Sequence, residues 1–216
     1  MMTNIVVGAS GIDVPVGDHI CAFYRGQDER NEILLPFLRQ GLDDGDKSIC
    51  VIESMRPDEM LAALGEAPGE GGNPGSLDLM TPEQTYLRGG HFSMPAMLEY
   101  WRSGVESALA ESRYRFVRVV GEMPRALVEK ADLDEFLAYE SELNRFAPRY
   151  PQAILCLYDL DRFSGRVFLT IMRTHPIVLL NGTVLENPYY IDPDEFLADQ
   201  RPASVSPAPP AAAGEF

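Results

Sequence analysis

Residues 18–54, DHICAFYRGQDERNEILLPFLRQGLDDGDKSICVIES, decide the fold of this chain. The apolar run HICAFY (19–24) is typical of a buried strand. Leucines then recur at helical spacing, at Leu34, Leu35, Leu38 and Leu42. Gly41 and Gly45 are expected to end that helix, and KSICVIES (47–54) begins a second strand. A strand, a helix and a second strand in this order predict two parallel strands in one buried sheet.

The rest of the chain continues the alternation of strands and helices. Further strands are expected at 76–81, 114–123 and 152–160, and further helices at 57–64, 93–112, from 132 and at 164–173. Asn181-Gly182 predicts the turn of a hairpin within 175–190, and a last short helix is expected at 192–199. This order predicts an α/β three-layer domain with a mostly parallel central sheet.

Three segments follow from these patterns. Residues 1–17 are expected to be an N-terminal extension, and residues 18–199 to form the folded domain. Residues 200–216 are rich in proline and alanine and are expected to be a disordered tail.

The composition limits the partners. The net charge of −15 repels nucleic acid and anionic membranes, so neither is expected as a direct partner. The three cysteines lie in apolar runs, without a CxxC pair, which favours reduced thiols. The first residues lack the pattern of a signal peptide, and no apolar run approaches the length of a bilayer span. A cytoplasmic location is therefore expected.

Residues 41–48, GLDDGDKS, look like a phosphate-binding loop but do not have its spacing. The first and second glycines are one residue too close, and Asp46 precedes Lys47. The segment also follows a helix and leads into a strand, so no helix N-terminus would face a phosphate. We interpret it as the end of a helix followed by a turn.

Several segments together resemble one protein family. They are DHICAFY (18–24), the run ending at Glu53, GEMPRAL (121–127), YESELN (139–144), ILCLYD (154–159), THP (174–176) and NPYY (187–190). The set resembles the MEDS family, the sensory domain named for methanogens, methylotrophs and the DcmR regulator. The resemblance implies a RecA/KaiC-like fold that lacks the Walker A motif, with Glu53 where KaiC-type proteins have a catalytic glutamate and Glu122 where an acidic residue helps to hold magnesium.

The resemblance also implies a function. Such domains are sensors of small organic ligands, hydrocarbon derivatives among them, in bacterial or archaeal signalling. Relatives are often fused to DNA-binding or kinase-like output domains, which implies a regulatory protein partner of the kinase-like or transcription-regulator type. No cofactor is implied.

Ligands of open parallel sheets bind beyond the C-terminal ends of the strands. The residues expected there are Tyr24, Arg25, Glu53, Thr81, Glu122, Met123, Tyr158 and Asp159. They suit a small-molecule pocket with an apolar wall and a few polar groups. His175, extended because Pro176 follows it, would close that pocket or cap the preceding helix. Alternatively, Arg25 pairs with a nearby carboxylate and the other residues cap loops.

The leading prediction is a non-catalytic ligand-sensing domain, in which binding shifts the loops after the strands or a homodimer contact. One alternative is a degenerate nucleotide-binding domain or weak ATPase that uses Glu53 and Glu122 with magnesium. A second is a pure protein-interaction module. No catalytic residue is predicted, because carboxylates alone do not specify a reaction.

A metal site is the weaker interpretation of three buried residues. His19 and Cys21 share one face of the first strand, and Cys156 lies in another central strand. With His91 or His175 they would make a His/Cys site. No ligand pair of short spacing fixes such a geometry, so buried thiols and a histidine bonded to the backbone are favoured. The sequence therefore predicts no metal, and a redox-sensitive Cys21 is a further alternative.

Glu140 and Asn144 lie four residues apart, beside the buried face of one helix. A carboxylate there needs a partner, and Tyr114, Arg118 or a backbone amide are the candidates. A structural polar bridge is favoured over direct ligand binding.

Overall fold

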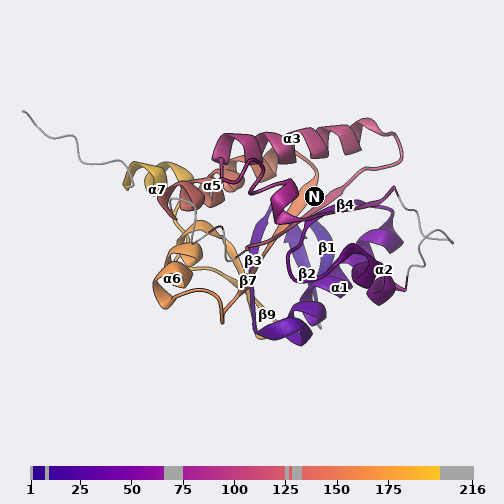
Figure 1. The fold of residues 1–216 in the computed structure, drawn as a ribbon, viewed down its shortest axis with the longest axis horizontal. Helices are drawn as coiled ribbons and strands as arrows, with labels where there is room; N and C mark the ends of the chain where they lie inside the picture. Colours follow the sequence, from indigo (N-terminus) through magenta and orange to yellow (C-terminus); the bar gives the residue numbers. More distant parts are fainter. Residues whose placement is uncertain (1, 8–9, 66–74, 125–126, 128–132, 200–216) are drawn as a thin grey trace, which may run out of the picture.

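The computed structural model describes residues 2–7, 10–65, 75–124, 127 and 133–199 (Figure 1). Within these residues the main sheet has seven strands in the order β5-β4-β6-β7-β3-β8-β9. The strands are β3 (His19–Tyr24), β4 (Lys47–Val51), β5 (Leu77–Met80), β6 (Val117–Glu122), β7 (Gln152–Asp159), β8 (Ile177–Leu180) and β9 (Thr183–Glu186). Neighbouring strands run parallel, except that β9 runs antiparallel to β8.

Helices cover both faces of the sheet, as the predicted three-layer fold requires. One face packs against α1 (Gly26–Asp44) and α2 (Pro57–Leu64). The other packs against α3 (Met94–Ala110), α5 (Leu133–Phe146), α6 (Gly165–Thr174) and α7 (Pro193–Asp199). Two short 3₁₀ helices, η1 (Pro82–Gln84) and η2 (Ala147–Arg149), lie in the connections. Figure 1 shows α3 and α5 side by side above the sheet.

The central strands are buried on both faces, which explains why they read as unbroken apolar runs. In β3, Ile20, Ala22 and Tyr24 face α1 and α2, whereas Cys21 and Phe23 face the α3, α5 and α6 side. Cys21 lies directly opposite Cys156 of β7 in the parallel register. Two faces of different composition therefore meet the two helical layers.

The predicted helix after β3 is present, but Gly41 does not end it. Helix α1 continues to Asp44, and Gly45 ends it in the left-handed conformation with φ 74°. Gly41 is buried inside the helix because the Arg118 side chain crosses it, and a Cβ there would lie 2.7 Å from Arg118 Cδ. The segment 41–48 is thus a helix end and a turn, as predicted.

Two strands lie within the segment that the sequence predicts to be an N-terminal extension. Strands β1 (Met2–Val7) and β2 (Ser10–Pro15) pair antiparallel in a separate two-stranded sheet, and β1 contacts α1. The predicted hairpin of β8 and β9 is also present, with φ 49° at Asn181 and φ 71° at Gly182. The predicted tail at 200–216 lies outside the described residues. None of the described helices is long and apolar enough to cross a bilayer.

Candidate functional site

Glu122, at the end of β6, joins the C-terminal ends of three strands. Its Oε1 accepts a hydrogen bond from the Tyr24 hydroxyl at 2.7 Å, and its Oε2 accepts from the backbone amides of Glu53 and Ser54 at 2.7 and 2.8 Å. The Ser54 hydroxyl also donates to Glu122. Burial and the neighbouring Glu122 charge raise the pKa of the Tyr24 phenol, which keeps it a donor. One buried carboxylate thus holds β3, β6 and the loop after β4 together.

We give the name strand-end cluster to Glu122, the residues bonded to it and those that Arg162 pairs with. Ion pairs extend this cluster toward solvent. Arg162 contacts Glu53 Oε2 at 2.5 Å and Asp159 Oδ2 at 3.1 Å. Arg30, buried in α1, donates to the Ser54 hydroxyl. The sequence did not single out Ser54, Arg30 or Arg162, because their roles depend on strand order.

The structure brings together four of the nine residues predicted for the strand-end pocket. Tyr24, Glu53, Glu122 and Asp159 belong to the strand-end cluster. The others lie elsewhere: Arg25 is exposed at the start of α1, Thr81 caps η1, Met123 and Tyr158 are core residues on the α3 and α5 side, and His175 ends α6. Side-chain alternation accounts for Tyr158, which points to the opposite face from its neighbour Leu157.

A small cavity lies beside the connection that follows β5. Its volume is about 90 Å³, and it is lined by Gln84, Thr85, Tyr86, Arg88, His91, Ser93, Ala96, Met97 and Tyr100. The lining combines aromatic and thioether surface with an arginine, a histidine and hydroxyl groups. His91 therefore belongs to this cavity, and the structure does not bring it to the buried cysteines.

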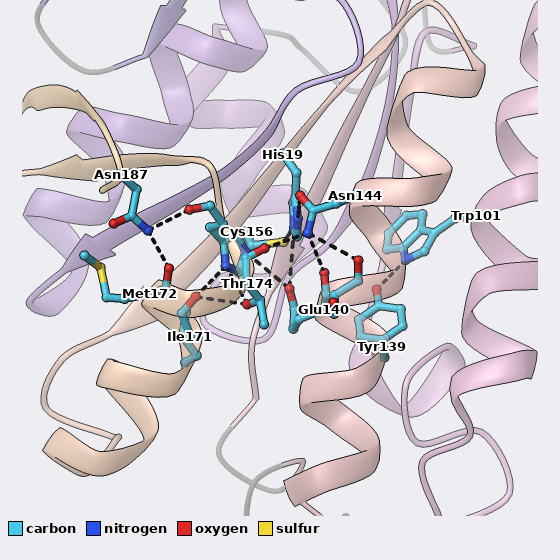
Figure 2. Close-up of polar contacts among 12 residues, drawn as sticks. His19, Trp101, Tyr139, Glu140, Asn144, Cys156, Ile171, Met172, Thr174 and Asn187 are labelled. Carbon is cyan, nitrogen blue, oxygen red and sulfur yellow. Dashed lines mark hydrogen bonds and ion pairs between the residues drawn. The ribbon is translucent and has the colours of Figure 1, made fainter. Parts of the chain in front are cut away.

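Four chemically reactive side chains meet on the α5 face of the sheet. We call them the buried quartet: His19, Glu140, Cys156 and His175. Their candidate ligand atoms all lie within 4.8 Å of one another, and each residue is at most 1% exposed. Figure 2 shows His19, Glu140 and Cys156 converging from β3, α5 and β7. Cys21, named with them from sequence, is not a member.

The distances within the buried quartet are short. His19 Nε2 lies 3.2 Å from Cys156 Sγ and 3.5 Å from Glu140 Oε2. His175 Nε2 lies 3.3 Å from the same carboxylate oxygen. The two imidazole centroids are 4.0 Å apart. Both histidines thus present Nε2 to a single point beside one carboxylate.

The surroundings fix the tautomer of each histidine. The Asn144 amide nitrogen donates to the Thr174 carbonyl at 2.6 Å, so its Oδ1 faces His19 Nδ1, 3.3 Å away. His175 Nδ1 lies 2.9 Å from the Ile171 carbonyl oxygen, which only accepts. The Thr174 hydroxyl, which donates to the Ile171 carbonyl, also lies 3.0 Å from His175 Nδ1. These contacts favour the tautomer protonated at Nδ1 in both rings, with both Nε2 atoms directed at Glu140.

The charge states follow from burial. Burial lowers the pKa of His19 to about 4, assisted by the neighbouring His175, so this imidazole is neutral at pH 7. Burial alone would raise the pKa of Glu140, and hydrogen bonds donated by His175 and His19 would lower it to about 2. Burial, and then the Glu140 charge, raise the pKa of the Cys156 thiol. In the apo protein an ionised carboxylate is therefore buried beside a neutral His19.

Asn187 of the NPYY segment positions His175. Its amide nitrogen donates to the carbonyls of His175, at 2.7 Å, and of Met172. These bonds hold the turn between α6 and β8 (Figure 2). His175 itself is extended, with φ −124° and ψ 121°, as the following proline predicts.

Glu140 and Asn144 form a polar bridge, but the predicted partners were wrong. Arg118 points to the opposite face of β6 and pairs with Asp46 and Asp44 at 2.9 and 3.2 Å. The Tyr114 hydroxyl donates to the Gly75 carbonyl. The true partners, His19 and His175, lie far away in sequence. Two features of the sequence could have indicated these partners. His19 and Cys156 lie on one face of the sheet, and Glu140 lies beside the buried face of its helix.

Solved structures of low sequence identity share the fold. An uncharacterised Pyrococcus horikoshii protein, PH0321, solved with an unknown peptide, matches with TM-score 0.55 and 16% identity, over 77% of this chain and 78% of that chain. The KaiC-like protein PH0186 of the same archaeon matches with TM-score 0.53 and 13% identity, over 82% of this chain and 80% of that chain. The fold is therefore RecA/KaiC-like, as the resemblance implied.

A curated relative and a family model identify the chain more closely. The transcriptional repressor DcmR of Methylorubrum extorquens is 28% identical over 177 residues, which cover 77% of this chain and 61% of the repressor. The chain thus matches about three fifths of that relative's length. The model of the methanogen/methylotroph, DcmR sensory domain matches residues 18–176. The match includes β3, β6 and β7 and reaches beyond His175. This chain belongs to the MEDS family of sensory domains.

Proposed function

We propose that this chain is a non-catalytic sensory domain that binds a small organic molecule and transmits the binding to a regulatory protein. Membership of a sensory-domain family and the similarity to a transcriptional repressor support a regulatory role. The partner would be a kinase-like protein or a transcription regulator, reached through the loops after the strands.

The cavity beside the β5–α3 connection is the observation that carries this proposal. Its volume of about 90 Å³ admits only a small molecule. Tyr86, Met97 and Tyr100 supply apolar and aromatic surface, while Arg88 and His91 supply polar groups. This combination suits a short-chain organic compound with one polar group. The connection follows the C-terminal end of β5, where ligands of such sheets are expected.

Tyr86 links the cavity to the strand-end cluster. It is buried, and its hydroxyl lies against Gly121 so closely that any side chain at Gly121 would overlap it. Gly121 immediately precedes Glu122, which holds the loops after β3 and β4. A ligand that displaces Tyr86 would therefore press on the end of β6 and change those loops. Signalling requires that the ligand favour one of the two arrangements.

Methyl NMR of methionine-labelled protein tests the proposal, because Met97 lines the cavity. Ethanol, acetone and acetate serve as probes, and native mass spectrometry of the purified protein detects any retained organic molecule. We expect saturable shifts of the Met97 methyl signal with at least one probe. Ala96→Trp, on the cavity wall, should abolish them. Ala110→Trp, at the exposed end of the same helix, is the matched control and should leave them unchanged.

Two results would contradict the proposal. One is that no probe shifts the Met97 signal and native mass spectrometry shows the bare chain. The other is that the shifts persist in Ala96→Trp, because binding would then occur elsewhere.

A further inference from the structure

We propose that the buried quartet binds one divalent transition-metal ion, with zinc as the best fit. The ion would be held by His19 Nε2, His175 Nε2, Cys156 Sγ and a Glu140 oxygen. This assignment is independent of the organic-ligand site, and it adds a resident ion to a domain for which the sequence predicted none.

Three of the six separations among the four ligand atoms match those of a tetrahedral ion, and the other three are at most 4.8 Å. Zinc bonds of about 2.0–2.3 Å at tetrahedral angles place neighbouring ligand atoms about 3.3–3.6 Å apart. The three separations described above are 3.2, 3.5 and 3.3 Å. Nitrogen, sulfur and carboxylate ligands suit zinc and its neighbours in the first transition row, whereas magnesium and calcium prefer oxygen alone.

The second argument comes from the atoms that meet at the centre. With both Nδ1 positions protonated, each Nε2 offers a lone pair toward an oxygen of Glu140, so acceptors face acceptors. Among the described residues, neither Glu140 oxygen has a hydrogen-bond donor with proper geometry, and His175 Nε2 has no hydrogen-bond partner. Buried polar atoms are seldom left in this state, and a bound cation is one of the recognised reasons for it.

Protonation of the two histidines would satisfy these buried atoms less well than a metal ion. Satisfying both imidazole contacts would need two imidazolium rings beside a single carboxylate, with ring centroids only 4.0 Å apart. The two positive charges would repel each other in a buried site. One divalent ion satisfies both Nε2 atoms and the carboxylate at once, and it binds Cys156 as the thiolate, whose proton is released to solvent.

The supporting residues are arranged as in known metal sites. Metal-bound histidines usually donate the second ring N–H to a carbonyl or carboxyl group, which fixes the ring. Here His19 is held by Asn144, as Figure 2 shows, and His175 is held by the Ile171 carbonyl. All four ligands come from the protein and are inaccessible to solvent, which is typical of a structural site rather than a catalytic one.

The test uses the full chain, freed of any tag and of metal, titrated with Co²⁺ as a spectroscopic probe. We expect one Co²⁺ per chain, with the visible bands of a tetrahedral complex and a thiolate-to-cobalt charge-transfer band. Cys156→Ser should abolish the charge-transfer band and weaken binding more than about 100-fold, since even supporting residues cost 10–100-fold. Cys21→Ser is the matched control: this thiol is equally buried and lies directly opposite on β3, but outside the quartet.

X-ray absorption of the zinc-loaded wild-type chain gives an answer that does not depend on whether a variant folds. We expect one sulfur at about 2.3 Å and the remaining ligands, nitrogen or oxygen, at about 2.0–2.2 Å. Zinc at one hundred times its Kd should raise the melting temperature by about 5–10 °C. Failure to take up a stoichiometric ion, or coordination without sulfur, overturns the proposal. Loss of the cobalt band in Cys21→Ser but not in Cys156→Ser does so too. None of these results would alter the Met97 experiment.

Discussion

At the scale of single residues, Glu122 is the member of the strand-end cluster that contributes most to stability. It is fully buried and accepts hydrogen bonds from one phenol, one hydroxyl and two backbone amides. Hydrogen bonds to a charged acceptor are stronger than neutral ones, and a buried donor left without an acceptor is costly. The Glu122 side chain therefore holds the ends of three strands together.

We predict that Glu122→Gln lowers the free energy of unfolding by about 2 kcal/mol or more, because the amide NH₂ would face the donors that the carboxylate now accepts. Urea denaturation measures the change. Glu53→Gln is the matched control: it removes only a partly exposed ion pair with Arg162 and should cost less than ~1 kcal/mol. Equal unfolding midpoints for the two variants would show that Glu122 does not stabilise the strand ends in this way.

At the scale of elements, the contact between α1 and β6 depends on one glycine and one arginine. Arg118 extends from β6 across Gly41 and donates to the Phe37 carbonyl at 3.0 Å and to Asp46 at 2.9 Å. The arginine is fully buried and is held by several acceptors at once. The helix can lie this close to the sheet only where it has no side chain.

Gly41→Ala should therefore destabilise the protein, although alanine favours helices by about 1 kcal/mol over glycine. The new methyl group would displace Arg118, and overpacking of this kind typically costs about 1–3 kcal/mol. Gly104→Ala in α3 is the control, because its Cβ would meet only the end of the Ile49 side chain, at 3.1 Å. Urea unfolding should show a loss for Gly41→Ala and little change for Gly104→Ala; the reverse order would contradict the role of Arg118.

The elements were predictable from sequence because they depend on local periodicity. The buried runs of β3 and β7, the hairpin turn at Asn181-Gly182 and the extended backbone at His175 each follow from a few adjacent residues. The extent of α1 was missed at Gly41, since its cause is a side chain from a distant strand. The buried quartet was only partly predicted for the same reason: strand order, which brings β3 beside β7 and β8, decides which histidine meets Cys156.

At the scale of the whole molecule, a RecA/KaiC-like fold has been kept while its phosphate site is absent. The turn after β3 lacks the Lys-Ser/Thr pair, and Asp28 and Glu29 occupy the first turn of α1. These carboxylates would repel phosphate groups at the helix N-terminus. Glu122, to which the family resemblance would assign a role in holding magnesium, is already surrounded by donors.

Mg-ATP should therefore give no saturable heat of binding in isothermal titration calorimetry, and no phosphate release should be detected. A saturable heat that disappears in Glu53→Gln would show instead that the domain is a degenerate nucleotide-binding protein. Arg162→Ala, which frees Glu53 from its ion pair, is a useful companion variant because it exposes the carboxylate without removing it. It too should fail to bind Mg-ATP.

The four residues of the buried quartet are synthesised at different times, and this affects when their face of the domain can fold. His19 leaves the ribosome early, whereas its neighbour His175 follows nearly the whole of the described domain. Until α6 has emerged, β3 and α5 can meet, but Glu140 has only one of its two imidazole neighbours. A nascent chain shorter than this must leave a carboxylate either in water or buried without compensation. The final closing of this face is thus expected to follow the synthesis of α6, and chains stalled before α6 are the natural targets of chaperones.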